Sequence, residues 1–121
     1  MIFLDGSQGE GGGQIVRTAL TLSCVLGVPV QIENIRAGRK PSGLRPQHLT
    51  AIRAAAEICD AAVDGLQVGA RTVRFEPGRP AKPGQYEWAV GTAGSAPLVI
   101  QTVLLPLALA DGPSTIRVAG G

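Results

Sequence analysis

The stretch that most constrains this chain is a glycine-rich segment near its start, DGSQGEGGGQ at residues 5–14. Its five glycines fall within eight residues, and it lies between an apolar run and a helix-like pattern. The segment is therefore predicted to join a strand to the N-terminus of a helix. Glycine permits positive φ and lets a ligand approach the backbone. A helix N-terminus offers free N–H donors and partial positive charge, so the arrangement predicts an anion site, usually for phosphate.

The glycine segment differs from two common nucleotide-binding loops. No Gly-Lys-Ser/Thr follows it, as a Walker A loop requires, and Gln14 stands where the dinucleotide fingerprint has its third glycine. Glu10 lies inside the loop, and a carboxylate beside a phosphate cradle suits a divalent cation that bridges the two. The alternative is a flexible glycine turn with an exposed glutamate.

A second anion-attracting segment is predicted from the charge distribution. The net charge of +2 is too small to argue for nucleic acid. However, Arg36, Arg39, Lys40 and Arg45 fall within ten residues that contain no acid, and they lead into a helix whose first turn holds His48. The segment is interpreted as a phosphate-binding loop, with a solvated basic loop as the alternative.

Length, composition and cysteine content limit the class of protein. A chain of 121 residues is one domain by default, and 45% hydrophobic with 17% charged residues predicts a compact fold. Cys24 and Cys59 lie in apolar helical patterns and are interpreted as buried free thiols. Free thiols and the lack of a secretory signal together predict a reducing, cytoplasmic setting. No apolar run reaches the length of a membrane span, so no membrane partner is expected.

Hydrophobic periodicity and turn residues predict the elements in chain order. They are a short buried strand at residues 2–5, a helix at 14–26, a strand at 28–35, a helix that opens near 45–47 with Val63 on its apolar face, a strand within 66–76, a strand at 86–90, a helix at 97–109 and a strand at 115–118. Gly27 is the expected C-cap of the first helix, Pro46 suits the first turn of the second, and Ser95 is a candidate N-cap of the third.

The predicted helix at residues 97–109 is apolar on nearly every face, and such a helix must be covered all round. A weak internal repeat relates residues 2–35 to residues 88–118 and places Arg17 and Gln101 at matching positions. Because the second unit is only half present, the chain is interpreted either as a fragment or as one whose helix another chain covers.

Four stretches resemble, in order, the RNA 3′-terminal phosphate cyclase family. They are DGSQGEGGGQIVRTAL at residues 5–20, IRAGR at 35–39, GLRPQHLTA at 43–51 and GTAGS at 91–95. The resemblance spans the whole chain and matches the N-terminal third of the family. It implies an α/β (α+β) fold. A βαβαββ unit with a mixed four-stranded sheet and two helices on one face would cover residues 1–84. A partial second unit would cover residues 85–121, with a strand, a helix at 96–110 and a strand at 114–119.

The resemblance implies a ligase-type enzyme of RNA processing that uses ATP to convert an RNA 3′-phosphate into a 2′,3′-cyclic phosphate. In the family a histidine takes AMP from ATP, AMP passes to the RNA 3′-phosphate, and the neighbouring 2′-OH displaces it. The implied partners are therefore ATP and RNA 3′-phosphate ends. The family's nucleophilic histidine lies far downstream, and His48 is not that residue. No catalytic residue is assigned, and the 121-residue chain alone is predicted to be an inactive, truncated form.

Carried over position by position, the resemblance assigns nine site residues. Glu10 would bind a divalent metal, Mg or Mn; Gln14, Arg17 and Gln101 would contact the nucleotide phosphates; and Arg36, Arg39, Arg45, Gln47 and His48 would hold the RNA phosphate end. Arginines suit a terminal phosphate because they bond it bidentately. The structural alternatives are a surface histidine at a helix start for His48 and a polar interruption of a buried helix for Gln101.

Three other functions compete with the cyclase. One is a noncatalytic relative of the same fold that binds RNA in ribosome assembly. Another is an enolpyruvate transferase on related repeats, which would not be expected to carry RPQH at residues 45–48. The third is an inactive truncated domain whose helix at 96–110 forms a homodimer or is covered by a missing C-terminal portion. Glu10 and the intact arginine set favour the cyclase over the noncatalytic relative.

Overall fold

The computed structural model describes residues 1–8, 13–91 and 95–120. Within these ranges the chain forms three helices and six short strands. In chain order they are β1 (Ile2–Asp5), α1 (Gln14–Leu26), β2 (Val30–Glu33), α2 (Pro46–Cys59), β3 (Ala62–Asp64), β4 (Val73–Glu76), β5 (Gln85–Val90), α3 (Ala96–Ala108) and β6 (Thr115–Gly120).

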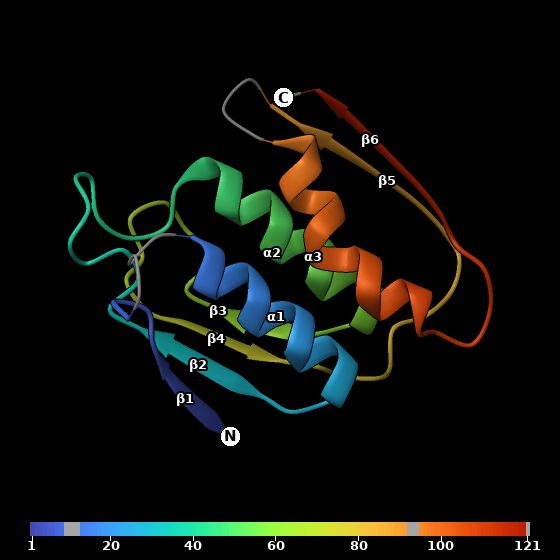
Figure 1. Ribbon diagram of the computed structural model, residues 1–121, viewed down its shortest axis with the longest axis horizontal. Helices are drawn as coiled ribbons and strands as arrows, with labels where there is room; N and C mark the ends of the chain where they lie inside the picture. The colour runs from blue at the N-terminus through green and yellow to red at the C-terminus, as the bar shows by residue number, and fades with distance from the viewer. Residues whose placement is uncertain (9–12, 92–94, 121) are drawn as a thin grey trace.

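The first four strands form one mixed sheet in the order β1-β2-β4-β3. β1 pairs parallel with β2, and Ile2 lies opposite Val30 in the register. β4 pairs antiparallel with both β2 and β3. Helices α1 and α2 cover one face of this sheet, as Figure 1 shows. The predicted mixed four-stranded sheet with two helices on one face is therefore confirmed.

The last two strands form a separate parallel pair. Gln85 of β5 lies opposite Thr115 of β6, and α3 connects the two strands. This connection follows from chain geometry, because parallel neighbours need a crossover, usually a helix. α3 packs against α1 and α2, and the β5–β6 pair lies on the far side of α2 and α3 from the larger sheet (Figure 1).

The main core lies between the four-stranded sheet and its two helices. Leu20 of α1, Ile52 and Ile58 of α2, Ile32 of β2 and Phe75 of β4 are all fully buried. Each such side chain contributes on the order of 1.5–3 kcal/mol through burial. The helices are therefore held firmly on the sheet, and this fixes the positions of their N-terminal ends.

Local sequence signals set the helix ends as expected. Gly27 ends α1 in the left-handed conformation, at φ 68°, and its N–H donates to the carbonyl of Ser23. Pro46 begins α2, and the Ser95 hydroxyl at the start of α3 accepts from the Leu98 N–H at 3.4 Å. The three end signals are confirmed because each depends only on residues within one turn.

Two strand predictions were wrong. β1 was expected to be buried, yet the Ile2 and Phe3 side chains are 46% and 65% exposed, because β1 is an edge strand with a single neighbour. Val63 was placed on the second helix but lies in β3. The helix ends earlier because Asp60 adopts φ 49°, a left-handed conformation that turns the chain out of α2. The strand expected within 66–76 is limited to β4.

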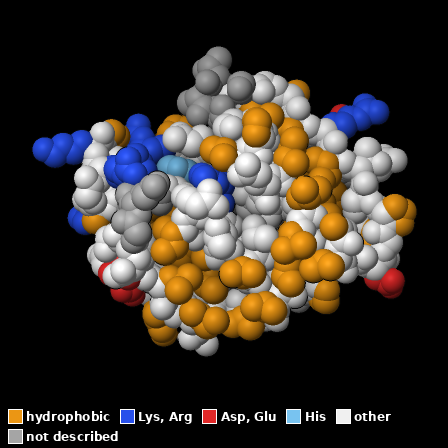
Figure 2. Space-filling model, viewed as in Figure 1, with side chains coloured by type: hydrophobic (Ala, Val, Ile, Leu, Met, Phe, Trp, Pro, Cys, Tyr) orange, Lys and Arg blue, Asp and Glu red, His pale blue; other side chains and the backbone are white. Residues whose placement is uncertain are grey.

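Within the described residues α3 is covered on only part of its surface, so the expectation that a missing portion or another chain covers the rest stays a prediction. Ile100, Leu104, Leu105 and Leu109 are 38–64% exposed. α1 and α2 cover the face that carries Val103, and much of the remainder faces solvent. Figure 2 shows hydrophobic side chains gathered over this region. None of the described helices is long and apolar enough to cross a membrane.

Candidate functional site

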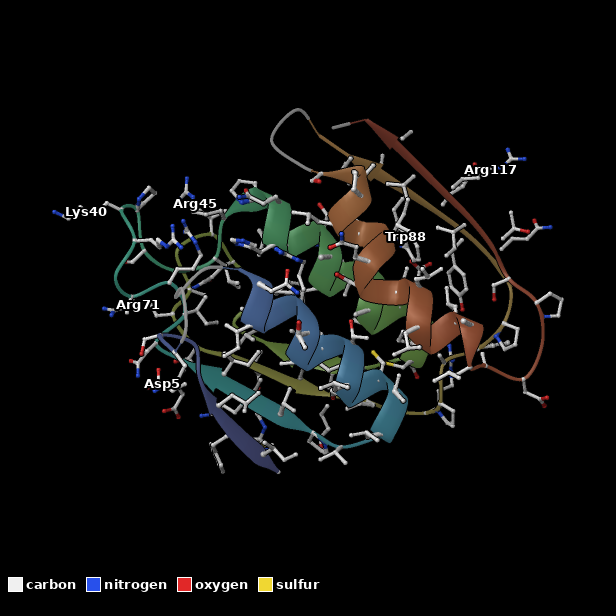
Figure 3. The ribbon with its side chains drawn as sticks, viewed as in Figure 1. Asp5, Lys40, Arg45, Arg71, Trp88 and Arg117 are labelled. Carbon is white, nitrogen blue, oxygen red and sulfur yellow. The ribbon has the colours of Figure 1, made fainter. Side chains whose placement is uncertain are left out.

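The N-terminal ends of α1 and α2 lie at one end of the helical layer, where β1 and β2 also end (Figure 1). Neither helix has an acidic residue in its first turn, so the partial positive charges of both ends are not offset there. The loop between β2 and α2 carries Lys40 and Arg45 to this same end of the molecule, as Figure 3 shows. The topology thus brings the two predicted anion-attracting segments together.

A contact between Gly13 and His48 joins the two helix ends. A Cβ atom built on Gly13 would lie 2.3 Å from the His48 Nε2 atom and 3.0 Å from an Arg17 Nη atom. No side chain fits in that space without displacing the imidazole. At position 13 the glycine is therefore required by close packing against α2.

His48 is a buried residue at this junction, with 4% of its surface exposed, so the alternative of a surface histidine is wrong. Its Nδ1 atom accepts a hydrogen bond from the Arg45 N–H at 2.9 Å and caps the start of α2. Because an N–H can only donate, Nδ1 is unprotonated and the proton of the neutral ring is on Nε2. Burial, followed by the charges of Arg36, Arg17 and Arg45, lowers the pKa of His48 to about 4.

Three arginines form a cationic cluster around the neutral imidazole of His48. Arg17, Arg36 and Arg45 lie close enough to His48 for their charges to disfavour its protonation. Burial and the charges of Arg39 and Arg45 also lower the pKa of Arg36. The positive charges of these arginines repel one another, and an anion placed among them would relieve the repulsion.

Arg36 has a structural role in addition to its charge. It adopts φ 49°, and one guanidinium nitrogen donates to the carbonyls of Pro41 and Gly43, each at 2.9 Å. The backbone of Gly43 in turn donates to the Ile35 carbonyl at 3.0 Å. Arg36 therefore closes the basic loop on itself and sets the direction in which the chain enters α2.

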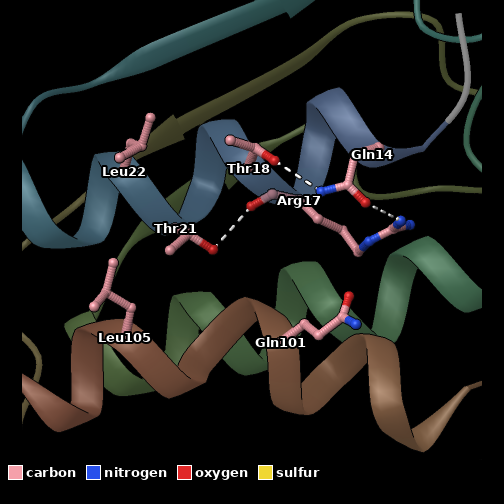
Figure 4. Close-up of a pocket in the computed structure, with 7 residues that line it drawn as sticks. All are labelled: Gln14, Arg17, Thr18, Thr21, Leu22, Gln101 and Leu105. Atoms are coloured by element: carbon pink, nitrogen blue, oxygen red, sulfur yellow. Dashed lines mark hydrogen bonds between the residues drawn. The ribbon is translucent and has the colours of Figure 1, made fainter. Parts of the chain in front are cut away.

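A groove between α1 and α3 adjoins the arginine cluster. It has a volume of about 290 Å³ and is lined by Gln14, Arg17, Thr18, Thr21, Leu22, Gln101 and Leu105. Figure 4 shows Gln14, Arg17 and Gln101 side by side at one end of the groove, although Gln101 comes from a different helix. An Arg17 Nη atom donates to Gln14 Oε1 at 2.9 Å, while the buried Arg17 Nε has no partner among the described residues.

Thr21 is a site-supporting residue that the sequence analysis did not single out. Its hydroxyl lies 2.8 Å from the Thr102 carbonyl on α3 and 3.0 Å from the Arg17 carbonyl on α1. This contact holds the two walls of the groove together. A threonine in an apolar helical pattern carries no sequence signal for such a link, since its partner is far away in the chain.

The structure accounts for the predicted site residues as follows. Gln14, Arg17 and Gln101 meet in the groove, and Gln101 is exposed there, so it is not a polar interruption of a buried helix. Arg36, Arg45 and His48 form the cluster, with exposed Arg39 in the adjoining loop and Gln47 in the first turn of α2. Glu10 lies outside the described residues. Within the described ranges, no group of three or more His, Cys, Asp or Glu side chains could hold a metal ion.

Comparisons with known proteins match the chain over nearly its full length. Residues 8–121 match the family model described as RNA 3′-terminal phosphate cyclase. The RNA 3′-terminal phosphate cyclase of Ralstonia nicotianae is 58% identical over 120 residues, which cover 99% of this chain and 34% of that protein. The Koribacter versatilis protein of the same name is 60% identical over 121 residues, which cover 100% of this chain and 34% of that protein. The chain thus spans about a third of the length of these relatives. It belongs to the RNA 3′-terminal phosphate cyclase family.

Proposed function

We propose that this chain supplies the phosphate-binding part of an ATP-dependent RNA 3′-phosphate cyclase, a ligase-type enzyme that forms 2′,3′-cyclic phosphate ends. The observation that carries the proposal is the junction of Gly13, Arg17 and His48, where two helix N-termini and three arginines converge. Such a site suits phosphate oxygens because it combines backbone donors, a neutral Nε2–H and guanidinium forks. The relatives' names supply the reaction class.

Two phosphate-binding places are proposed within this region. The groove with Gln14, Arg17 and Gln101 would take the phosphates of ATP, and the cluster with Arg36, Arg45 and His48 would take the RNA 3′-phosphate. Arg17 lies at both, since it lines the groove and its charge acts on His48. Bringing the two anions to one arginine would stabilise the negative charge that builds up as AMP moves between them. Arg39 and Gln47 would extend the contacts to the RNA end.

A divalent metal, Mg or Mn, stays part of this proposal through Glu10. When bound, it would neutralise charge on the nucleotide phosphates. The described residues by themselves do not form a metal site. The roles proposed for the arginines and for His48 therefore do not depend on the metal.

His48 is proposed to bind and not to attack. Its Nδ1 lone pair is occupied by the Arg45 N–H, and its Nε2 carries the proton. A nucleophilic histidine needs a free lone pair directed at phosphorus. We therefore expect that residues 1–121 incubated with α-labelled ATP and Mg²⁺ or Mn²⁺ retain no label on the denatured protein. A covalent label that persists in wild type and is lost in H48Q would contradict this role.

The experiment that tests the proposed function compares two RNA ends. Labelled oligoribonucleotides with a 3′-phosphate or a 3′-hydroxyl are titrated with the chain, and fluorescence anisotropy measures each Kd. We expect the 3′-phosphate to bind at least about tenfold more tightly, because charge-assisted contacts are worth about 1.5–3 kcal/mol. The substitution R45Q should remove most of this difference. R117Q is the matched control, because Arg117 lies at the opposite end of the molecule (Figure 3).

Equal affinity for the two RNA ends would count against the cyclase proposal. It would favour the alternative of a noncatalytic relative that binds RNA in ribosome assembly, because such a protein has no need for a terminal phosphate. Loss of binding in R117Q to the same extent as in R45Q would point to nonspecific charge attraction.

A further inference from the structure

Two cysteine thiols meet in the core at the ends of α1 and α2 that lie opposite the phosphate-binding region. The sulfur of Cys24 is 3.6 Å from the sulfur of Cys59. Both residues are free cysteines, with 4% and 0% of their surfaces exposed. The two sulfurs are in contact, although 35 residues of chain separate them. The proposed function uses neither thiol.

A surface pocket is lined in part by Cys24. It has a volume of about 290 Å³, and its walls are the end of α1 and the turn after β4; the lining residues are Cys24, Val25, Leu26, Gly27, Pro77, Gly78, Arg79 and Pro80. Cys24 is thus the member of the pair that lines the pocket. Arg79 is fixed there, because one of its guanidinium nitrogens donates to the Ile58 carbonyl at 2.8 Å.

The contact between the two thiols shifts their pKa values in opposite directions. The S–H···S contact with Cys24, and to a lesser degree the positive charge of Arg79, lower the pKa of Cys59, although burial and Asp60 act against this. The same contact and burial raise the pKa of Cys24. Once one proton is lost, the remaining proton is shared between the two sulfurs, as in other strongly coupled pairs. Thiolate is the form that reacts with oxidants.

We propose that Cys24 and Cys59 form a reversible oxidation site, which hydrogen peroxide entering through this pocket converts to an intramolecular disulfide. The directions of the two pKa shifts favour the thiolate on Cys59, but Cys24 is the member of the pair that lines the pocket. The reaction therefore begins when the shared proton moves to Cys59, and the Cys24 thiolate then attacks one peroxide oxygen. The O–O bond breaks, the leaving hydroxide takes up a proton to become water, and Cys24 becomes a sulfenic acid. The Cys59 sulfur then gives up its proton and attacks the Cys24 sulfur, releasing a second water. In total, two thiols are oxidised to one disulfide and one peroxide is reduced to two waters.

The disulfide would tie the end of α1 to the end of α2. These two helices carry Arg17 and His48 at their other ends, so oxidation would act on the same pair of elements that forms the phosphate-binding region. A thiol reductant would restore the open form by exchange. The inference stands on the cysteine geometry and does not depend on the proposed function.

The test uses the native 121-residue chain. It is treated with one to a few equivalents of hydrogen peroxide, denatured in the presence of an alkylating agent, and weighed by mass spectrometry. We expect a monomer that has lost two hydrogens, about 2 Da, and carries no alkyl group. Treatment with a reductant before alkylation should restore two alkylated cysteines. Peptide mapping should identify the Cys24–Cys59 link.

Two single variants then test the order of attack. In C59A, Cys24 has no partner, so a sulfenic-acid probe such as dimedone should label it. In C24A, the buried Cys59 should be labelled at least about tenfold more slowly. Equal labelling of the two variants would overturn the assigned order. The inference itself is overturned if the folded wild-type chain keeps two alkylatable thiols, or if its only oxidation products are sulfinic acids or disulfide-linked dimers. The wild-type result decides this even where a variant does not fold.

Discussion

Replacing Gly13 with alanine is the sharpest test of the junction between α1 and α2. The new Cβ atom would lie 2.3 Å from His48 Nε2 and 2.8 Å from His48 Cδ2, both shorter than van der Waals contact. The imidazole is buried and held by the Arg45 N–H, so it cannot turn aside without losing that hydrogen bond. The substitution should therefore destabilise the folded chain.

The expected magnitude follows from opposing effects. Overpacking a filled site costs about 1–3 kcal/mol, and loss of the capping hydrogen bond adds about 1 kcal/mol if the ring is displaced. The backbone of Gly13 has φ −76° and ψ −11°, which alanine adopts freely, so reduced freedom of the unfolded chain returns about 0.4–1 kcal/mol. The net loss in the free energy of unfolding should be about 1–3 kcal/mol.

Urea denaturation followed by circular dichroism measures this loss. Gly38→Ala is the matched control, because no atom lies within 4 Å of its added Cβ and its φ is not positive. That variant should stay within about 0.5 kcal/mol of wild type. In a double-mutant cycle, His48→Ala should remove most of the penalty of Gly13→Ala. The reasoning is refuted if Gly13→Ala is as stable as Gly38→Ala, or if the two substitutions at the junction are additive.

Three further predictions concern titration, the helix contact and burial. Because the pKa of His48 is about 4 in the folded chain and 6.5 when exposed, the unfolded chain binds the proton first. Stability should therefore fall as the pH drops from 6.5 to 4, and H48Q, which keeps an acceptor for the cap, should lose that slope in urea titrations. Thr21→Val should cost about 1 kcal/mol by breaking the bond to α3, whereas Thr18→Val, at an exposed position, should cost less than about 0.5 kcal/mol in the same assay. Val103→Ala should lower the free energy of unfolding by about 2 kcal/mol, because the Val103 side chain is 0% exposed. Leu104→Gln should change it little, because Leu104 is 56% exposed. Equal losses in the two variants would refute the described packing of α3.

The helices could be predicted from the sequence more fully than the strands. The span of α1 was correct at both ends, because its apolar period is long and Gly27 marks its end. β3 could not be predicted because it is three residues long and follows α2 with little separation. Its start depends on the left-handed turn at Asp60, a conformation that aspartate adopts only occasionally and that the sequence pattern alone therefore indicates only weakly.

Burial was the property that sequence predicted least well. Ile2 and Phe3 have the composition of a buried strand, but β1 is at the edge of the sheet. Leu104 and Leu105 belong to an apolar helix, but the described elements cover only part of its surface. Hydrophobic pattern reports which side chains favour burial, and the arrangement of neighbouring elements decides which of them are buried.

The sequence by itself determined the local parts of the candidate site. It placed the glycine segment before one helix and the basic loop before another, since caps, turns and helix period depend on residues a few positions apart. The tertiary structure decided how those parts meet. It set His48 against Gly13 and Gln101 beside Arg17, and it made the histidine a buried, neutral donor among arginines. These features depend on the packing of α1, α2 and α3, which brings together residues that are far apart in the chain. The glycine at position 13 is therefore explained only once α2 is packed against α1.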